Sequence, residues 1–271
     1  MDKNDFLFEL KSLLRYHQAS GIERYPKGVD SDAFFRFQPL SYVLQRSAVQ
    51  TEKPNGALTL GGRSVLSVDV EKSPLNLSDI AEEVAVCRAC DLHKQRLYPA
   101  PGRGSDKVRL LIVGDWLASD DQGHLSPGQI FGVEQEQMLI KMLIAIRMPI
   151  SSVFITNVIK CAVPATCQPQ ANHVQSCISF LRRQISVLMP EMICTMGMIA
   201  ARAILEKSLP LARLRGKLHG YEVGNVKIPV VTTYHPTYLL QNPEMKTATW
   251  ADLQLLAREL QCKEGRLKTH G

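Results

Sequence analysis

The stretch Val108-Arg109-Leu110-Leu111-Ile112-Val113, followed by Gly114-Asp115, sets the fold class of this 271-residue chain. A short and almost uninterrupted apolar run is typical of a strand that is buried on both faces of a parallel sheet. Comparable runs follow at 153–156, 192–196 and 230–234. Helical periodicity separates and follows these runs, at 135–147, 170–188, 198–207 and 247–260. The alternation predicts an α/β fold, with three α/β/α layers and a central four-stranded parallel sheet.

Upstream of this region the chain changes character. Residues 5–19 carry apolar residues on one helical face, so we expect an amphipathic helix within residues 1–27. Residues 28–74 show no long period and contain Pro54-Asn55-Gly56 and Gly61-Gly62, which indicates a linker. The α/β domain is then expected at 75–262 and a short tail at 263–271.

The composition argues against a secreted or membrane protein. The net charge of +6 fits a nucleic-acid partner, and it fits an ordinary soluble enzyme equally well. No apolar run reaches the roughly 18 residues that a membrane helix needs, and the opening Met1-Asp2-Lys3-Asn4-Asp5 is too acidic for a secretory signal. We therefore expect a cytoplasmic protein whose seven cysteines are thiols or metal ligands rather than disulfides.

Residues that can carry chemistry stand directly after each predicted strand. They are Gly114 and Asp115, then Asn157, then Gly197, and finally His235. Because ligands bind outside the carboxyl ends of parallel strands, these residues should meet at one edge. A carboxylate can position water, an amide can read the edge of a base, and an imidazole can stabilise a leaving anion. Each residue taken singly is more often structural, but together they predict an active cleft.

Four cysteines have the spacing of a metal centre. Cys87 and Cys90 form a Cys-x2-Cys pair ahead of the first strand, and Cys161 and Cys177 flank the loop that follows the second strand. Ligation by cysteine alone suits zinc or an iron–sulfur cluster, and the spacing does not separate the two. Alternatively, Cys161 or Cys177 is an ordinary buried thiol. Cys167 lies in the same loop and can be mistaken for a ligand.

Three groups of residues recur in the order of a known family. They are Cys87-Arg88-Ala89-Cys90-Asp91-Leu92 with Arg96, Gly102 and Gly104; Thr156-Asn157-Val158-Ile159-Lys160-Cys161 with Cys177; and Tyr234-His235-Pro236-Thr237-Tyr238-Leu239-Leu240 with Pro243, Lys246, Trp250, Asp252 and Leu253. In these motifs the chain resembles the family-4 uracil-DNA glycosylases of bacteria and archaea.

The resemblance implies a fold with four parallel strands and a set of roles. It implies a structural 4Fe–4S cluster, with zinc as the alternative, on Cys87, Cys90, Cys161 and Cys177. It implies that Asn157 hydrogen-bonds uracil and that His235 stabilises the charge that develops on uracil O2 as the glycosidic bond breaks. Leu239 and Leu240 stand where the family wedges the DNA after a base has left, and Arg215-Gly216 resembles a segment near the DNA.

The first motif departs from the family pattern, Gly-Glu-Ala/Gly-Pro-Gly. The chain has Gly114-Asp115-Trp116-Leu117-Ala118, so Asp115 keeps the charge with a shorter reach. Asp121 falls where the family has its second acid, and either carboxylate would position the attacking water. Trp116 fills the pocket, stacks on a base, or packs as an ordinary core residue; the sequence leaves these three open.

The second motif departs as well. The family has Pro-Phe-x-Gly, whose phenylalanine stacks on uracil, and the chain has Gln129-Ile130-Phe131-Gly132. Aligned on the glycine, Ile130 takes the aromatic position and Phe131 lies one residue later. We nevertheless count Gly114, Phe131, Asn157 and Leu239 as the substrate-binding set.

Two functions fit these observations. The first is a DNA repair glycosylase that excises uracil, with catalytic His235, Asp115 and Asp121. The second is a catalytically degenerate protein on the same fold, similar to the psi subunit of the bacterial clamp loader, which would bind a replication or repair protein through its N-terminal helix. The drifted motifs favour the second function, and the intact Asn157 and His235 favour the first.

Overall fold

The computed structural model describes residues 76–119 and 125–268. In this part of the chain the main sheet has six strands, in the order β2-β5-β3-β7-β9-β8. They are β2 (Arg103–Gly104), β5 (Val153–Asn157), β3 (Leu110–Gly114), β7 (Met192–Met196), β9 (Val226–Thr233) and β8 (Leu218–Val223). The four inner strands run parallel, which confirms the predicted parallel sheet. Strands β2 and β8 extend it by one antiparallel strand at each edge.

The inner strands are apolar because both faces of the sheet are covered. Every residue of β3, β5 and β7 is buried. The edge strands were not predicted, because β2 has two exposed residues and β8 alternates exposed with half-buried positions. Strand β8 turns into β9 through Gly224, whose φ of 55° lies in the left-handed region that favours glycine.

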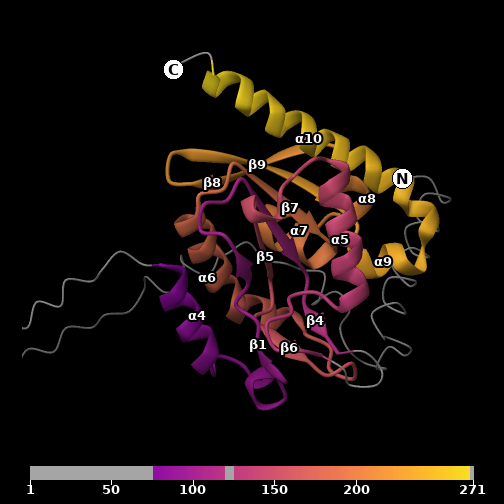
Figure 1. Ribbon diagram of the computed structural model, residues 1–271. Coiled ribbons are helices and arrows are strands. Elements are labelled where there is room, and N and C mark those ends of the chain that lie inside the picture. The colour runs from indigo at the N-terminus through magenta and orange to yellow at the C-terminus, as the bar shows by residue number, and fades with distance from the viewer. Residues whose placement is uncertain (1–75, 120–124, 269–271) are drawn as a thin grey trace, which may run out of the picture. The chain divides into compact units, whose positions relative to one another are not determined.

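Helices cover both faces of the sheet in a doubly wound pattern (Figure 1). Helix α5 (Val133–Ala145) connects β3 to β5, whereas α6 (Ala171–Leu188) and α7 (Met198–Leu205) carry the chain in the opposite direction, to β7 and β9. Because right-handed crossovers in opposite directions place their helices on opposite faces, α5 lies across the sheet from α6 and α7. The predicted α/β/α layers are therefore confirmed.

The face with α5 holds the largest core cluster. Helices α9 (Pro236–Gln241) and α10 (Lys246–Lys268) join α5 there, and Figure 1 shows these three helices on the same side of the sheet. On the other face α4 (Leu77–Val86) packs against α6 through Ile80, Val84 and Phe180. The remaining short helices are η1 (Asp91–Lys94), η2 (Ile150–Ser152), α8 (Leu211–Leu214) and η3 (Pro243–Met245).

A second, small sheet was not foreseen. It consists of β1 (Tyr98–Pro99), β6 (Cys161–Val163) and β4 (Leu117–Ala118), in the order β1-β6-β4. Strand β4 follows β3 and β6 follows β5, so the small sheet lies beyond the carboxyl ends of both. Strands of two or three residues leave no periodic signal in the sequence.

The ends of the chain limit what can be compared with the expected domain organisation. The helix expected within 1–27 and the linker at 28–74 lie outside the described residues. Helix α10 continues to Lys268, past the expected boundary at 262. No described helix is long and apolar enough to cross a membrane.

Candidate functional site

The carboxyl ends of β3 and of its two neighbours, β5 and β7, lie at the switch point of the sheet, where doubly wound folds bind ligands. Strands β3 and β5 end at Gly114 and Asn157, which are register partners. Asn157 is fully buried, and its Nδ2 donates a hydrogen bond to the Ile130 carbonyl over 2.6 Å. Its Oδ1 is buried and has no hydrogen-bond partner within the described segments. Buried polar atoms are almost always paired, so this oxygen can accept a hydrogen bond from a ligand.

Gly114 leaves room for two neighbouring side chains. A Cβ at this position would overlap Asn157 Oδ1 and would lie 2.8 Å from Cζ of Phe131. A residue larger than glycine would therefore displace the amide, the aromatic ring or both. The sequence placed Gly114 among the substrate-binding residues, and its contribution here is this close approach.

Phe131, not Ile130, supplies the aromatic ring at the switch point. The ring of Phe131 stacks on that of His235, with centroids 5.2 Å apart and planes inclined by 25°. Ile130 contributes only its carbonyl, the acceptor of the Asn157 amide. Alignment on the glycine therefore misplaces the aromatic position by one residue, and Phe131, Asn157, Gly114 and His235 come together as one group.

His235 offers a buried hydrogen-bond donor. Its Nδ1 accepts from the backbone N–H of Thr237 over 3.2 Å, at the start of α9. Burial lowers the pKa of His235 to about 4, so the ring is neutral near pH 7 and its proton lies on Nε2. Nε2 is buried and has no partner in the described part of the chain. The site thus presents an unpaired acceptor on Asn157 and an unpaired donor on His235, both next to Phe131.

Asp115 is held by the start of α7. Its Oδ1 accepts from the backbone N–H of Ala200 over 2.6 Å, and its carboxylate lies against Gly197, where a Cβ would overlap it. Gly197 has a φ of 104°, which glycine adopts readily. A carboxylate at a helix N-terminus is favourable because of the helix dipole. Asp115 therefore has a structural role beside any catalytic one, and Asp121 lies outside the described residues.

The residues expected to contact DNA differ in exposure. Leu239 is fully buried in the core, whereas Leu240 is partly exposed. Trp116 is also partly exposed. Arg215 turns inward, where it donates to Asp252 Oδ2 over 3.0 Å and lies over the ring of Tyr234.

The four cysteines of the predicted centre surround one small cavity. Cys87 ends α4, Cys90 precedes η1, Cys161 begins β6, and Cys177 lies in the second turn of α6. Cys167 does not line it, and neither does Cys194, in the core. Burial raises the thiol pKa of Cys90, of Cys161 and of Cys177, the last to about 11.

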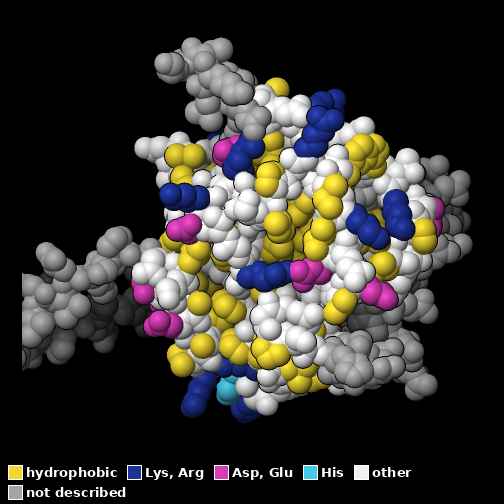
Figure 2. Space-filling model, in the orientation of Figure 1, with side chains coloured by type: hydrophobic (Ala, Val, Ile, Leu, Met, Phe, Trp, Pro, Cys, Tyr) yellow, Lys and Arg dark blue, Asp and Glu magenta, His cyan; other side chains and the backbone are white. Residues whose placement is uncertain are grey.

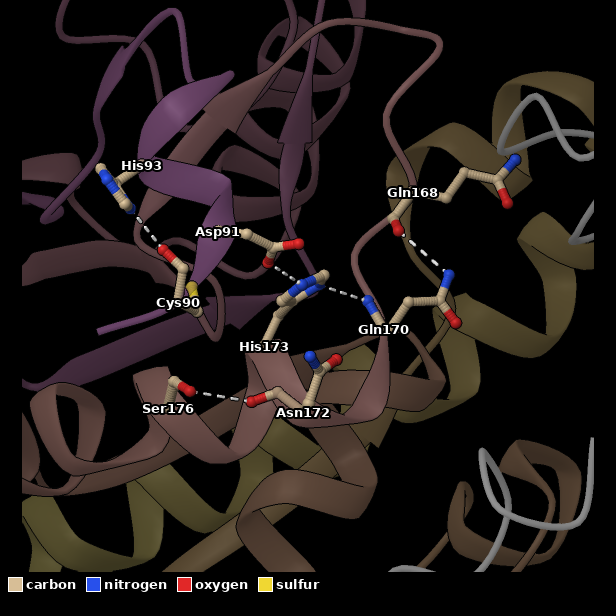
Figure 3. Close-up of polar contacts among 8 residues, drawn as sticks. All are labelled: Cys90, Asp91, His93, Gln168, Gln170, Asn172, His173 and Ser176. Atoms are coloured by element: carbon tan, nitrogen blue, oxygen red, sulfur yellow. Dashed lines mark hydrogen bonds and ion pairs between the residues drawn. The ribbon is translucent and has the colours of Figure 1, made fainter. Parts of the chain in front are cut away.

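Polar side chains brace the segments that carry these cysteines (Figure 3). His173, on α6, donates from Nε2 to Asp91 Oδ1 over 2.7 Å, and its Nδ1 accepts from the backbone N–H of Gln170. His93 is bonded through Nδ1 to the carbonyl of Cys90 over 2.6 Å. The Cys90 turn is therefore fixed to α6, the helix that bears Cys177.

Arg96 provides a second brace. Its guanidinium donates to the carbonyls of Val84 and Ala85, at the end of α4, over 3.0 and 2.6 Å. It also approaches Sγ of Cys161 at 4.0 Å. The cation Arg96 lines the cavity together with Lys160, whose pKa burial lowers to about 7, and no carboxylate is among the lining residues. The donor set and the charge of the lining fit a thiolate-bound, negatively charged inorganic group.

Comparison with known protein families agrees with this geometry. Residues 101–254 match the model of the uracil DNA glycosylase superfamily, a span that includes the switch point and two of the four cysteines. The chain belongs to the uracil-DNA glycosylase superfamily. This result confirms the resemblance inferred from the sequence motifs.

Named relatives of this superfamily member include glycosylases of two types. The chain is 31% identical over 183 residues to the type-4 uracil-DNA glycosylase of Archaeoglobus fulgidus, covering 66% of this chain and 90% of that protein. It is 31% identical over 186 residues to the type-4 enzyme of Pyrobaculum aerophilum, covering 67% and 93%. The type-5 uracil-DNA glycosylase of the same organism is 30% identical over 158 residues, covering 53% and 68%.

The sequence analysis did not single out the side chains that lie around the cysteines and brace their segments. Lys160 is fully buried and Arg96 contacts a cysteine, but both were quoted only as parts of motifs. The sequence did contain a signal for Lys160. It stands inside the apolar run Val158-Ile159-Lys160-Cys161-Ala162-Val163, where a lysine is either buried and paired or marks an exposed position. No comparable signal distinguished His173, whose partner Asp91 is distant in sequence.

Proposed function

We propose that this protein is a uracil-DNA glycosylase, which hydrolyses the bond between uracil and deoxyribose. The observation that carries the proposal is the pair of buried polar atoms next to Phe131, Asn157 Oδ1 and His235 Nε2, which lack partners among the residues described. Uracil offers matching groups, because its N3–H is a donor, its O2 is an acceptor and its flat ring can stack on Phe131. Cytosine has no proton on N3, so it would present a lone pair to the Asn157 oxygen.

In the proposed reaction the bond between C1′ and N1 breaks and its electron pair stays with uracil. The negative charge spreads to O2, where His235 Nε2–H donates a hydrogen bond. A neutral imidazole suits this role, because the low pKa of His235 keeps a proton on Nε2 without a net charge. The oxygen of a water molecule forms the new bond to C1′, and the proton that this water gives up ends on the departing uracil anion, which leaves as neutral uracil. Asp115 and Asp121 remain our candidates for the carboxylate that positions this water.

DNA is the proposed partner, in line with the printed names of the relatives. Exposed lysines near the site support this assignment. Lys217 precedes β8, whose Leu218 pairs with Val231 near the carboxyl end of β9, and Lys246 begins α10. Their phosphate contacts would offset the few kcal/mol that base flipping costs. Because Leu239 is buried, Leu240 is the better candidate for the wedge.

For the inorganic centre we propose a 4Fe–4S cluster rather than zinc. The support is the lining of the cavity: all four cysteines border it beside the guanidinium of Arg96, and no carboxylate is among the lining residues. Zinc needs its sulfurs about 2.3 Å from one point, whereas a cluster fills a space. When bound, the cluster would cross-link the four segments that bear Cys87, Cys90, Cys161 and Cys177. Iron and sulfide analysis tests this, and a colourless zinc protein contradicts it.

The activity test is release of uracil from uracil-containing DNA by anaerobically purified protein. We expect release by the wild type and a loss of about 10²–10³-fold in His235→Ala, the range for removal of one donor to a developing anion. His219→Ala is the matched control, because in the described part of the chain the His219 ring is hydrogen-bonded to the Leu214 carbonyl. No release by the wild type, with iron content intact, would contradict the proposal.

The alternative is a glycosylase-fold protein that binds without cleaving. Two observations favour it: the first-motif acid Asp115 is engaged as a helix cap, and α5 exposes Val133, Ile140 and Ile144. Figure 2 shows hydrophobic side chains over the centre of the face that α5 crosses. Binding of uracil-DNA with unchanged substrate after prolonged incubation would favour this function.

A further inference from the structure

Lys160 lies between the cysteine cavity and the switch point. It is 1% exposed, and its Nζ donates to Thr156 Oγ1, to the Asn157 carbonyl and to Gln184 Oε1 over 2.6, 2.7 and 2.6 Å. Three acceptors therefore surround this one nitrogen. Two of them belong to the last two residues of β5, the strand that delivers Asn157.

The partners of Lys160 are themselves fixed. Thr156 Oγ1 and Gln184 Nε2 both donate to the Pro101 carbonyl, over 3.0 and 2.6 Å. Gln184 belongs to α6, so the network joins the end of β5 to the helix that carries Cys177. Thr156 and Gln184 each donate to the Pro101 carbonyl and accept from Lys160, and such connected networks hold one geometry.

The same residue also reaches the cysteines. Lys160 lines the cavity together with Cys177. The next residue in the chain is Cys161, which lines it as well. One lysine thus borders the cysteine cavity and holds the end of the base-reading strand through its side chain.

We propose that Lys160 is a positioning residue that couples the inorganic centre to Asn157, by holding the Asn157 carbonyl and the Thr156 hydroxyl against α6. The inference rests on the proposed function, because it assigns Asn157 the reading of the base. When the network is intact, the Asn157 carboxamide is fixed with Nδ2 on Ile130 and Oδ1 toward the ligand. When Lys160 is lost, the strand end can shift and the oxygen no longer meets the base.

The first test compares Lys160→Met with wild type, both purified with their inorganic centre. We expect a lower melting temperature but iron content close to wild type, and a single-turnover rate of uracil release per iron-loaded molecule at least about tenfold lower, as a displacement near 1 Å can cause. Lys141→Met, on the exposed surface of α5, is the matched control and should keep the wild-type rate. An unchanged rate per loaded molecule would overturn the proposal.

The second test does not need activity. Hydrogen–deuterium exchange should be faster in residues 153–160 of Lys160→Met, while residues 171–181 of α6 keep their protection. If exchange increases equally in residues 153–160 and 171–181, or if α6 loses protection together with the iron, Lys160 has only a general structural role and the proposal is wrong. If the wild type releases no uracil, the proposed function is wrong. The exchange experiment still tests whether Lys160 holds the end of β5 in place.

A milder variant covers the case in which Lys160→Met does not fold. Gln184→Met removes one acceptor of Lys160 and one donor to Pro101, and it leaves the ammonium in place. We expect the same increase of exchange in residues 153–160, but smaller. Exchange identical to wild type in this variant would overturn the proposal.

Discussion

The cysteine cavity and the switch point are both buried, but they differ in how their polar groups are satisfied. Around the cavity, His173 and Arg96 each bond to another segment, and His93 bonds to the Cys90 carbonyl within its own turn. At the switch point, Asn157 Oδ1 and His235 Nε2 have no partner among the residues that the structure describes. Satisfied networks stabilise a fold, whereas an unpaired buried polar atom costs about 1–3 kcal/mol.

This difference separates the two regions by role. A fold that tolerates two unpaired atoms next to Phe131 at a ligand-binding edge gains from them only when a ligand supplies the missing partners. The cavity instead gathers four thiols from four segments, and its braces hold those segments in place. Changes at the cavity should therefore act first on stability, and changes at the switch point should act first on chemistry.

The largest effect is expected from Cys161→Ala. Losing one of four ligands should release the inorganic centre, and structural metal sites contribute much of the folding free energy of their domains. We expect loss of bound iron and a melting temperature lower by more than about 10 °C. Calorimetry together with iron analysis measures both.

Cys167→Ala is the matched control for this experiment. Cys167 lies in the same loop region and is half-buried, but it does not line the cavity. Wild-type iron content and melting temperature are expected. If Cys167→Ala loses iron and Cys161→Ala keeps it, the assignment of the ligands is wrong.

The second effect is a pH dependence that arises at the switch point. The folded-state pKa of His235 is about 4, below the ordinary value of 6.5, because burial disfavours the charged ring. Between pH 6.5 and pH 4 the His235 ring is protonated in the unfolded chain but not in the folded chain. The free energy of unfolding therefore decreases as the pH drops from 6.5 to 4. The full contribution is about 3 kcal/mol.

His235→Gln should remove this contribution. Urea unfolding at pH 7.5 and pH 4.5 measures it as the difference between the two proteins, since the other groups titrate alike in both. The wild type should lose more stability than the variant on acidification. Parallel loss in the two proteins would show that the ring is not held neutral by burial.

The sequence determined the inner architecture better than its edges. The runs at 153–156 and 192–196 were long, apolar and doubly buried, so their positions followed from periodicity alone. Strands β1, β2, β4 and β6 have two or three residues and depend on partners elsewhere in the chain. Pairing across sequence distance, not local pattern, creates such strands.

The site was predictable in its residues but not in its contacts. Post-strand positions correctly brought together Gly114, Asn157 and His235, because the topology of the sheet fixes that edge. The sequence did not indicate that Leu239 is buried or that Asp115 caps α7, since both depend on tertiary packing. For the same reason, alignment on Gly132 misplaced the aromatic ring that belongs to Phe131.

The smallest effect concerns the rim of the switch point. If base choice lies with the buried atoms, the exposed Lys217 and Lys246 should add affinity without selectivity. For Lys217→Ala and Lys246→Ala we expect weaker DNA binding at low salt and a salt slope, log K against log salt, shallower by about 0.9 for each lysine that contacts duplex phosphate. Fluorescence anisotropy over a salt series measures the slope.

Selectivity gives this last prediction its control. In both lysine variants, the affinity for uracil-containing duplexes and the affinity for undamaged duplexes should decrease by the same factor, because phosphate contacts do not depend on the base. Arg215→Ala should leave the slope unchanged, since its guanidinium is already committed to Asp252 and the Ala248 carbonyl. A lysine variant that lost affinity only for uracil-containing DNA would place base reading at the rim, and the unpaired atoms beside Phe131 would then need another explanation.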